Sequence, residues 1–385
     1  MGPTLHALSI HVDYRCAGTS LCCASGWRIP VERSVRQHIT RLMAEGRIAV
    51  PGGETDPEVL FERCDELPES RSALLGTRGG RCVFLEDSGL CAIHRQAGHS
   101  ALPSECQHFP RICVLHPLGV SVTLSHLCPT AAEMLFREDR PLAIVVNPPI
   151  LSERETWEGL DAREALPPMI CPDALMRWED HAHWERHMVA TLARGDLTPE
   201  QALGLLAAQG EMIRSWRESD GEFSEHLRRC CDEGRPSESG SHGLGIESTE
   251  AIFRELLHCI PPSAQIGPPP CLDHFADHLG RSVQPHWLEF QGPIRRYLAS
   301  KAFANWIAYQ GQGMRSALFA VIAAHASLRV HAALRCEEAG RPLDRDLLRE
   351  AIRDSDLLLV HRMSRELFTA LCDRRELDVS DHLTT

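Results

Sequence analysis

The cysteines constrain this chain more than any other feature, because nine of its sixteen lie before residue 130 of 385. The first group stands in the segment YRCAGTSLCCASGW, where Cys16, Cys22 and Cys23 fall within eight positions. Adjacent side chains point apart in a regular backbone, so Cys22 and Cys23 are poorly placed to form a disulfide with each other. The same divergence suits two neighbouring binding sites, with one thiol serving each.

The location expected for the chain decides how these thiols are interpreted. The first residues, MGPTLHALSIHVDYR, lack the charged start and the long apolar core of a secretory signal. The longest apolar runs, such as ALFAVIAA, are far shorter than a membrane span. We therefore expect a cytoplasmic, thiol-reducing location, in which cysteines serve as metal or cluster ligands before they form disulfides.

Composition limits the partners that the chain can have. Its apolar fraction of 43% is enough to build cores without disulfides. The net charge is −13, whereas a general nucleic-acid binder is normally basic, so we expect no nucleic-acid partner. We expect no membrane partner either. An acidic surface tolerates the basic segments of a protein partner, such as lysine-bearing tails.

Further potential ligands follow the first group at spacings that suit a metal. Cys82 and Cys91 flank a short strand and a turn, and Cys91 and His94 have the C-x2-H spacing with which a turn presents two ligands to one ion. Cys106 lies in a proline-flanked segment, and a proline follows Cys128. Thiolate and imidazole suit zinc, iron or an iron–sulfur cluster. The conjunction of these groups favours a metal site.

Burial in a hydrophobic core is the alternative role for each of these cysteines, because free cysteine packs well in protein interiors. Cys64 and Cys113 fall outside the ligand pattern, and for them we expect the core role.

Changes in composition along the chain predict an α+β N-terminal cysteine-cluster domain followed by an all-α helical domain, so that the chain is mainly α overall. The expected bounds are 1–140 for the first domain, 141–170 for a proline-rich linker, and 171–385 for the helical domain, with internal linkers near 217–247 and 261–270.

Local signals place several elements. Apolar spacing predicts a helix over 31–43, and the proline and glycine at 117 and 119 predict a hairpin turn. A helix is expected to begin just after Cys128. Thr198, Pro199 and Gln201 form the start signal of another helix, a capping box with proline in the first turn. The longest and most buried helix is expected over 313–340.

Four segments together resemble a known family: YRCAGTSLCCASGWRIPV, GRCVFLEDSGLCAIHRQAG, LPSECQHFPR and VTLSHLCPTAAEMLF. Their order and approximate spacing are similar to those of cysteine-cluster proteins with a zinc- or iron-chelating domain, and within that family to the flagellin lysine-N-methylase branch. The likeness covers about residues 11–137. It is looser in the helical part, through IRRYLASKAFANW and SDLLLVHRMSRELF. The chain departs from that branch between Cys16 and Cys22, where it has no further cysteine.

The resemblance implies a set of metal ligands. These positions are Cys16, Cys22, Cys23, Cys82, Cys91, Cys106 and Cys128, with His94 as an eighth candidate. Eight ligands would fill the shells of two four-coordinate ions, or hold one iron–sulfur cluster with some ligands left over.

The resemblance further implies S-adenosylmethionine-dependent N-methylation of a protein lysine, with an iron–sulfur cluster or zinc as cofactor and a lysine-bearing protein as substrate. The residues themselves identify neither a catalytic group nor a methyl-donor site, because the glycine-rich fingerprint of ordinary methyltransferases is absent from the sequence. Two alternatives stay open. One is a non-enzymatic module in which zinc stabilises a small domain that binds a protein partner, and the other is a redox or metal sensor.

Overall fold

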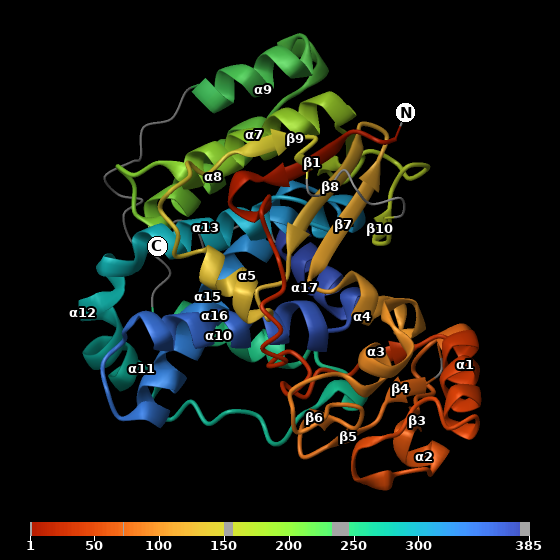
Figure 1. Ribbon diagram of the computed structural model, residues 1–385. Coiled ribbons are helices and arrows are strands. Elements are labelled where there is room, and N and C mark those ends of the chain that lie inside the picture. Colours follow the sequence, from red (N-terminus) through yellow and green to blue (C-terminus); the bar gives the residue numbers. More distant parts are fainter. Residues whose placement is uncertain (1, 72, 150–156, 233–245, 378–385) are drawn as a thin grey trace.

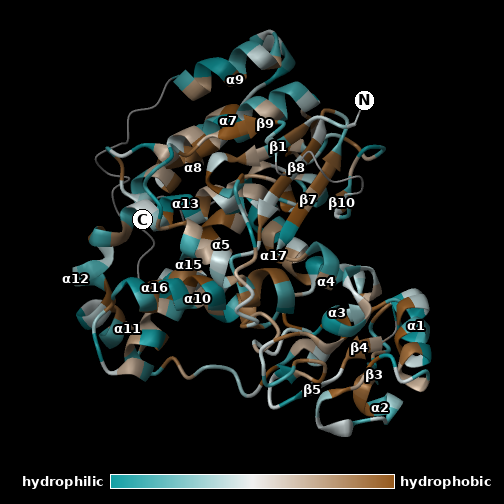
Figure 2. Cartoon of the chain, in the orientation of Figure 1, coloured by the Kyte–Doolittle hydropathy of each residue, from teal (hydrophilic) through white to brown (hydrophobic). Residues whose placement is uncertain are grey.

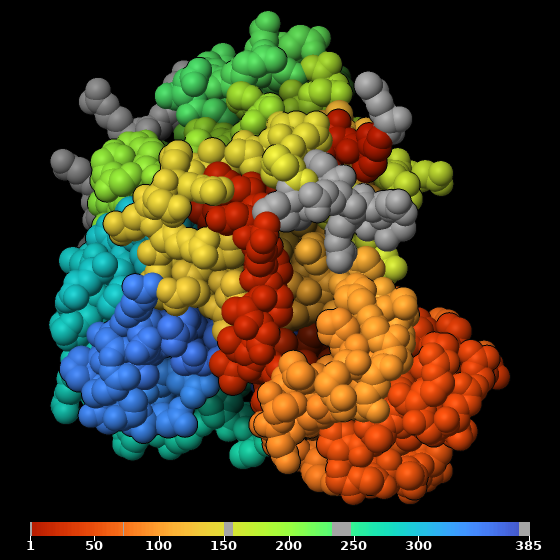
Figure 3. Space-filling view, viewed as in Figure 1, coloured from red at the N-terminus to blue at the C-terminus, as the bar shows by residue number. Residues whose placement is uncertain are grey.

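The computed structural model describes residues 2–71, 73–149, 157–232 and 246–377. Figure 1 shows a large body, in which helices surround a mixed sheet, and a small lobe of short elements beside it. The lobe comprises residues 14–110, and most of it forms the red-to-orange mass beside the body in Figure 3, whereas Tyr14 at its start packs on residues of the body. Helices prevail in the body, and both parts contain strands. The predicted class, α+β and mainly α, is confirmed.

The body is built on a five-stranded sheet with the strand order β10-β7-β8-β1-β9. The strands are β1 (Leu5–Leu8), β7 (Arg111–His116), β8 (Gly119–Leu124), β9 (Ile144–Val146) and β10 (Leu160–Asp161). β7 and β8 form the predicted hairpin. β1 pairs in parallel with β8 and antiparallel with β9, so the sheet joins the first residues of the chain to residues beyond 140.

The lobe consists of short elements. They are α1 (Arg33–Ala44), α2 (Pro57–Leu60), α3 (Ala92–Ala97) and α4 (Ser104–His108), a sheet of β2 (Pro30–Val31), β4 (Ala73–Leu75) and β3 (Phe61–Arg63), and the hairpin of β5 (Thr77–Arg78) and β6 (Arg81–Cys82). α1 confirms the helix predicted over 31–43, and it buries Ile39 and Leu42. Gly79 and Gly80, both with positive φ, form the turn between β5 and β6, a conformation that glycine adopts without steric cost.

Helices make up most of the body. They are α5 (Pro129–Met134), α7 (Trp178–Ala193), α8 (Pro199–Arg214), α9 (Phe223–Asp232), α10 (Ile246–Leu257), α11 (Phe275–His278), α12 (Gln284–Trp287), α13 (Gln291–Ala302), α14 (Ile307–Gln310), α15 (Met314–Ala339), α16 (Arg345–Asp356) and α17 (Arg365–Leu377). β11 (Met169–Cys171) and β12 (Ala174–Leu175) form a small hairpin. A π-helical turn, Leu357–Arg362, joins the end of α16 to the residues before α17.

Local sequence explains where several of these helices begin. Thr198 accepts a hydrogen bond from the Gln201 N–H and the Gln201 side chain accepts one from the Thr198 N–H, which confirms the predicted capping box. Asp344 caps α16 in the same manner by accepting from the Leu347 N–H. α5 begins at the proline after Cys128, as expected.

The main core joins the sheet to the helices. Leu8 and Val114 from the strands are buried in one cluster with apolar residues of α7, α8, α13, α15 and α16, whose inner sides are brown in Figure 2. The lobe has its own smaller core, which includes Leu60, Phe84 and Ile93. Cys64 and Cys113 are buried, as expected for core cysteines.

α15 is the longest described helix, as the sequence predicts. The sequence analysis expected no segment long and apolar enough to span a membrane, and α15 differs from that expectation. It is long and apolar enough to cross a membrane by length and composition, but 78% of its most apolar window is buried inside the protein. Its contacts with α8, α10, α13, α16 and α17 are those of a central core helix.

Elements also fall within the predicted linkers. Residues 141–170 contribute β9 and β10 to the sheet of the body. α9 occupies part of the stretch near 217–247, of which residues 233–245 lie outside the described residues. The stretch near 261–270 holds one short 3-10 turn, Pro262–Ala264. The division into domains itself stays a prediction.

Candidate functional site

The predicted cysteine ligands lie at the ends of short elements, most of them in the lobe. Cys22 and Cys23 occupy a turn, Cys82 ends β6, and Cys91 directly precedes α3. Cys106 lies in α4. Two backbone hydrogen bonds bring the first segment beside the second: the Cys82 N–H donates to the Cys23 carbonyl over 2.9 Å, and the Gly26 N–H donates to the Gly80 carbonyl over 2.8 Å.

Six of these thiols interact electrostatically, because Cys22 also raises the pKa of Cys128, after burial. The pKa of Cys22 is lowered to about 7, first by a hydrogen bond from the neighbouring Cys23 thiol. The same hydrogen bond, burial and the charges of Cys22, Cys82 and Cys106 raise the pKa of Cys23. Burial is the largest cause that raises the pKa of Cys82, to about 12, and of Cys106, on which Cys82, Cys91 and Cys22 also act. Segments far apart in the sequence thus bring thiols close enough to oppose one another's ionisation.

Tyr14 connects two of the candidates. Its hydroxyl lies 3.3 Å from the Cys128 sulfur, and both Cys128 and Cys16 raise its pKa, after burial. Cys128 is buried and Cys16 is exposed. His94 is exposed, and its ring meets that of His99 with the ring centres 5.9 Å apart.

A complete metal site is not formed by these side chains as they stand. Across the described ranges, no three His, Cys, Asp or Glu side chains are placed to hold one ion. The donor chemistry nevertheless fits a thiophilic metal, because a bound cation would lower the pKa of these crowded thiols and favour the thiolate form. The ligand set therefore stays a prediction, with its cysteines drawn from four segments of the chain.

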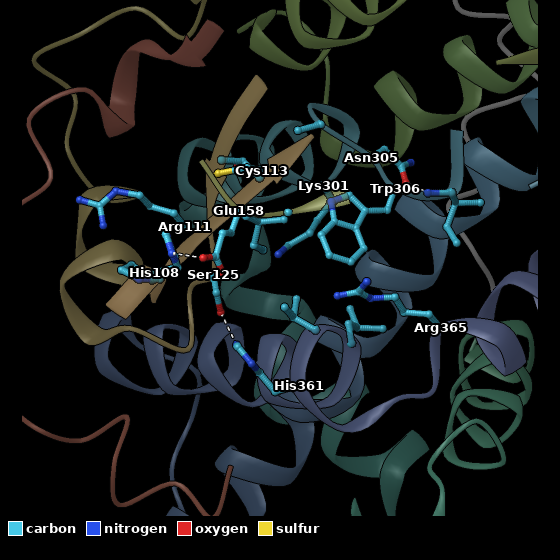
Figure 4. Close-up of a pocket in the computed structure, with 18 of the residues that line it drawn as sticks. His108, Arg111, Cys113, Ser125, Glu158, Lys301, Asn305, Trp306, His361 and Arg365 are labelled. Atoms are coloured by element: carbon cyan, nitrogen blue, oxygen red, sulfur yellow. Dashed lines mark hydrogen bonds and ion pairs between the residues drawn. The ribbon is translucent and has the colours of Figure 1, made fainter. Parts of the chain in front are cut away.

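A cavity of about 610 Å³ lies between the lobe and the body. Its walls come from α4 and the residues after it, from β7 and β8, from the end of α13 and the residues that follow, and from the residues around the start of α17. Figure 4 shows a selection of these side chains. The helical segments IRRYLASKAFANW and SDLLLVHRMSRELF, which carry the looser resemblance, both reach this cavity.

An aromatic group next to the cysteine segments lines the cavity. Trp27, four residues after Cys23, packs against Phe109 and His361 with ring centres 4.9 and 4.4 Å apart. All three line the cavity, as do Ser104, Glu105 and His108 of α4, the helix that carries Cys106. The cysteine segments and the cavity therefore share the same short elements.

A buried ionic network supports the cavity wall at Lys301. The Lys301 Nζ lies 2.5 Å from Asp356 Oδ1, and the Tyr297 hydroxyl donates to the same oxygen over 3.0 Å. The backbone N–H of His126 donates to the other carboxylate oxygen. Burial by itself would raise the pKa of Asp356, but Lys301 and His126 hold it well below its usual range. Asp356 is therefore an anion in the protein interior, and Lys301 is its counter-charge.

Two histidines extend this network away from the cavity. His126 Nε2 lies 3.3 Å from His11 Nε2, and His126 Nδ1 lies 3.4 Å from Asp356 Oδ2 without the geometry of a hydrogen bond. Burial lowers the pKa of both histidines, most strongly that of His11, so both rings are neutral near pH 7.

His361 is a neutral hydrogen-bonding group in the cavity. Its Nε2 lies 2.7 Å from the Ser125 hydroxyl, an interaction drawn in Figure 4. Burial lowers the pKa of His361 to about 3. It lies on the π-helical turn that follows Asp356, and such turns often occur at functional sites.

Sequence reasoning proposed the cysteines as ligands, which stays a prediction, and made no prediction for Lys301, Asp356 or His361 of the cavity and its wall. One signal was available, because Lys301 is the single lysine among 40 Lys and Arg residues. All the remaining Lys and Arg positions hold arginine, so a lysine at 301 indicates a place that suits a compact ammonium. The planar guanidinium of arginine is larger and forms hydrogen bonds in a different geometry. Asp356 and His361 gave no comparable signal.

Comparison with known proteins shows distant, partial similarity to two bacterial proteins. The chain is 24% identical over 167 residues to the Lysine-N-methylase of Salmonella choleraesuis (strain SC-B67), covering 41% of this chain and 39% of that protein. It is 23% identical over 139 residues to the Flagellar biosynthetic protein FliU of Salmonella muenchen, covering 34% of this chain and 76% of that one. The chain thus spans about two fifths of the length of the first.

No family model matches the chain. No solved structure matches it either.

Proposed function

We propose that this chain is a cysteine-cluster protein that transfers a methyl group from S-adenosylmethionine to a lysine amine of a protein substrate. The observation that carries the proposal is the cavity of about 610 Å³ that shares its walls with the cysteine segments. Cavities of 300–1,000 Å³ suit small-molecule ligands, whereas a module in which metal only stabilises a docking surface needs no such cavity. The distant similarity to a Lysine-N-methylase supports methyl transfer as the reaction.

Methylation of lysine requires a neutral amine, because an ammonium has no lone pair with which to attack the methyl carbon. A group in the cavity must therefore accept a proton from the substrate. His361 is a poor acceptor, since burial lowers its pKa to about 3. Glu105 and Glu158 are the carboxylates in the wall nearest α4, and Glu158 lies 3.3 Å from His108. We assign the acceptor role to one of these two carboxylates, Glu105 or Glu158.

The proposed metal ligands are the seven cysteines Cys16, Cys22, Cys23, Cys82, Cys91, Cys106 and Cys128, with His94 as the eighth candidate. A thiolate-bound zinc ion or iron–sulfur cluster would cross-link the segments that carry Trp27 and α4, and so fix one wall of the cavity. The location we propose remains cytoplasmic, where thiolate sites of this kind stay reduced.

The first experiment is metal, iron and acid-labile sulfide analysis of protein purified without oxygen, followed by transfer of a labelled methyl group from S-adenosylmethionine to flagellin. Iron and sulfide in whole-number ratio with label on substrate lysines support the proposal. Because Lys301 is the single lysine, side-chain label on the chain itself can fall at one lysine only.

Two other outcomes would contradict the enzyme assignment. Stoichiometric zinc, with neither label transfer nor binding of the methyl donor, would indicate the zinc-stabilised binding module. A folded protein with free thiols and no metal would indicate that the cysteines are core residues and not ligands.

A further inference from the structure

Arg365 is a cation of the cavity without a carboxylate partner. Within the residues that the structure describes, it forms no ion pair, although most arginines of the molecule do, including Arg71 and Arg163 in the same cavity. Its guanidinium instead lies over the ring of Trp306, 3.5 Å from the ring centre. The side chain is exposed, yet surrounding protein lowers its pKa by desolvation, because the surface it exposes belongs to a concave wall.

Lys301 contributes to the same part of the cavity. Its ammonium has three N–H donors, of which Asp356 accepts one, and its side chain is 12% exposed. Figure 4 shows Lys301, Trp306 and Arg365 together, coming from α13, the residues after it and the start of α17. The ring of Trp306 supports the guanidinium of Arg365 from one face.

Each acidic group of the cavity is paired with another basic residue, although Glu105 also lies close enough to Arg365 to raise its pKa. Glu105 pairs with Arg71, Glu158 with His108, and Asp161 with Arg163. Glu105 and Glu366 act on Arg365 from a distance, but within the described residues no carboxylate forms an ion pair with its guanidinium. Since Asp356 neutralises Lys301, this wall offers one guanidinium to an incoming anion, which matches a carboxylate better than a phosphate dianion.

We propose that Lys301 and Arg365, with Trp306 as the support of Arg365, form the site that binds the carboxylate of an organic ligand in this cavity. The identity of that ligand rests on the proposed function, in which the methyl donor carries an amino-acid carboxylate. The aromatic wall of Trp27 and Phe109 receives the remainder of the ligand.

The test compares two ligands that differ in the carboxylate-bearing part. S-adenosylhomocysteine and 5′-methylthioadenosine share the nucleoside and the sulfur, and the second lacks the amino-acid group. Titration calorimetry on the full chain is expected to show at least tenfold tighter binding of S-adenosylhomocysteine. Arg365→Met should abolish most of this preference, and Arg365→Lys should restore part of it.

The matched control is Arg163→Met, which removes a cavity arginine that already has its own partner. It should leave the preference unchanged. Lys301→Met alone would leave the buried Asp356 carboxylate without its counter-charge. The role of Lys301 is therefore tested with the double variant Lys301→Met with Asp356→Asn, which removes both charges together. This double variant should also lose the preference.

The outcomes separate the two proposals. Equal binding of the two nucleosides, or a preference that survives in Arg365→Met and in the double variant, overturns the carboxylate site and leaves the proposed function standing. Binding of neither nucleoside contradicts the proposed function.

If neither nucleoside binds, the carboxylate site at Lys301 and Arg365 is tested separately. The measurement is the rate at which Lys301, the single lysine, undergoes reductive methylation with formaldehyde and borohydride. Citrate should slow the modification of Lys301 at least threefold relative to chloride at equal ionic strength, and should not do so in Arg365→Met. Equal rates in citrate and chloride would overturn the inference.

Discussion

The lobe and the body of this protein obtain their stability by different means. The body buries a long central helix, caps its helices with side chains such as Thr198 and Asp344, and neutralises buried charges internally. The lobe has short elements, a small core and a group of crowded thiols. The difference teaches where a metal would act: a metal held by the thiols, as we propose, would stabilise the lobe first and the cavity wall through the lobe.

The largest effect is expected where the body buries a charge. Asp356→Ala leaves the Lys301 ammonium, the Tyr297 hydroxyl and the His126 N–H without their acceptor, so the free energy of unfolding should fall by about 3–5 kcal/mol. Urea denaturation followed by circular dichroism measures this. Asp354, on the same helix as Asp356, forms a half-buried pair with Arg335 of α15, so Asp354→Ala is the control and should cost about 1 kcal/mol or less. Equal losses in the two variants would contradict the special role of Asp356.

A second effect comes from the pH dependence of the body. Burial raises the pKa of Glu185 to about 7, and its carboxylate accepts a hydrogen bond from the Ala304 N–H over 2.8 Å. The folded protein then binds a proton that the unfolded chain has lost, so this group makes stability fall as the pH rises from about 4.5 to about 7.

Glu185→Gln removes this titration while an amide oxygen can still accept from Ala304. The variant and the wild type should have similar stability near pH 4.5, and the variant should be more stable near pH 8, by roughly 3 kcal/mol at 1.36 kcal/mol per pKa unit. Urea titrations at both pH values measure the difference. A constant offset between the two proteins at all pH values would show that Glu185 does not titrate in this range.

The lobe should respond to metal removal where the body does not. If a metal cross-links the cysteine segments, a strong chelator applied without oxygen should lower the protection of lobe amides at least tenfold, or about 1.4 kcal/mol. Hydrogen exchange with mass spectrometry separates the lobe from the body. Protection that falls equally in both parts would mean that the thiols stabilise the whole molecule, and the contrast between lobe and body would then fail.

The smallest effect tests local capping in the two parts. Thr198→Ala removes the capping box of α8 and should cost the body about 1 kcal/mol. Thr40→Ala in α1 of the lobe is the control, because Thr40 lies inside the helix and only bonds back to the Arg36 carbonyl. It should be neutral or slightly stabilising. Thermal melts at fixed pH compare the two variants.

The sequence predicted those parts of the fold that depend on local signals. The capping box at Thr198, the hairpin between β7 and β8, the helix after Cys128 and the long helix α15 are all confirmed. Strand order was beyond reach, because β9 and β10 come from a proline-rich stretch whose sequence reads as a linker. Only pairing with β1 and β7 turns these short runs into strands.

The candidate site divides in the same way. The sequence could suggest the cysteines as ligands, because closely spaced thiols in a reducing compartment favour a shared metal or cluster. It could not suggest the cavity residues, because a buried aspartate or a neutral histidine depends on neighbours more than a hundred residues away, as Asp356 does on His126.

The sequence by itself determined the types of side chain that are available: clustered thiols near the start, helices behind them, and one lysine. The tertiary structure decided which of these meet. Packing of the lobe against the body placed Trp27 against His361 and formed the cavity, and the arrangement of the helices brought Asp356 of α16 to Lys301 of α13 as a buried counter-ion. Local preferences act over a few residues, whereas charge pairing and cavities arise from surfaces that meet only in the folded chain.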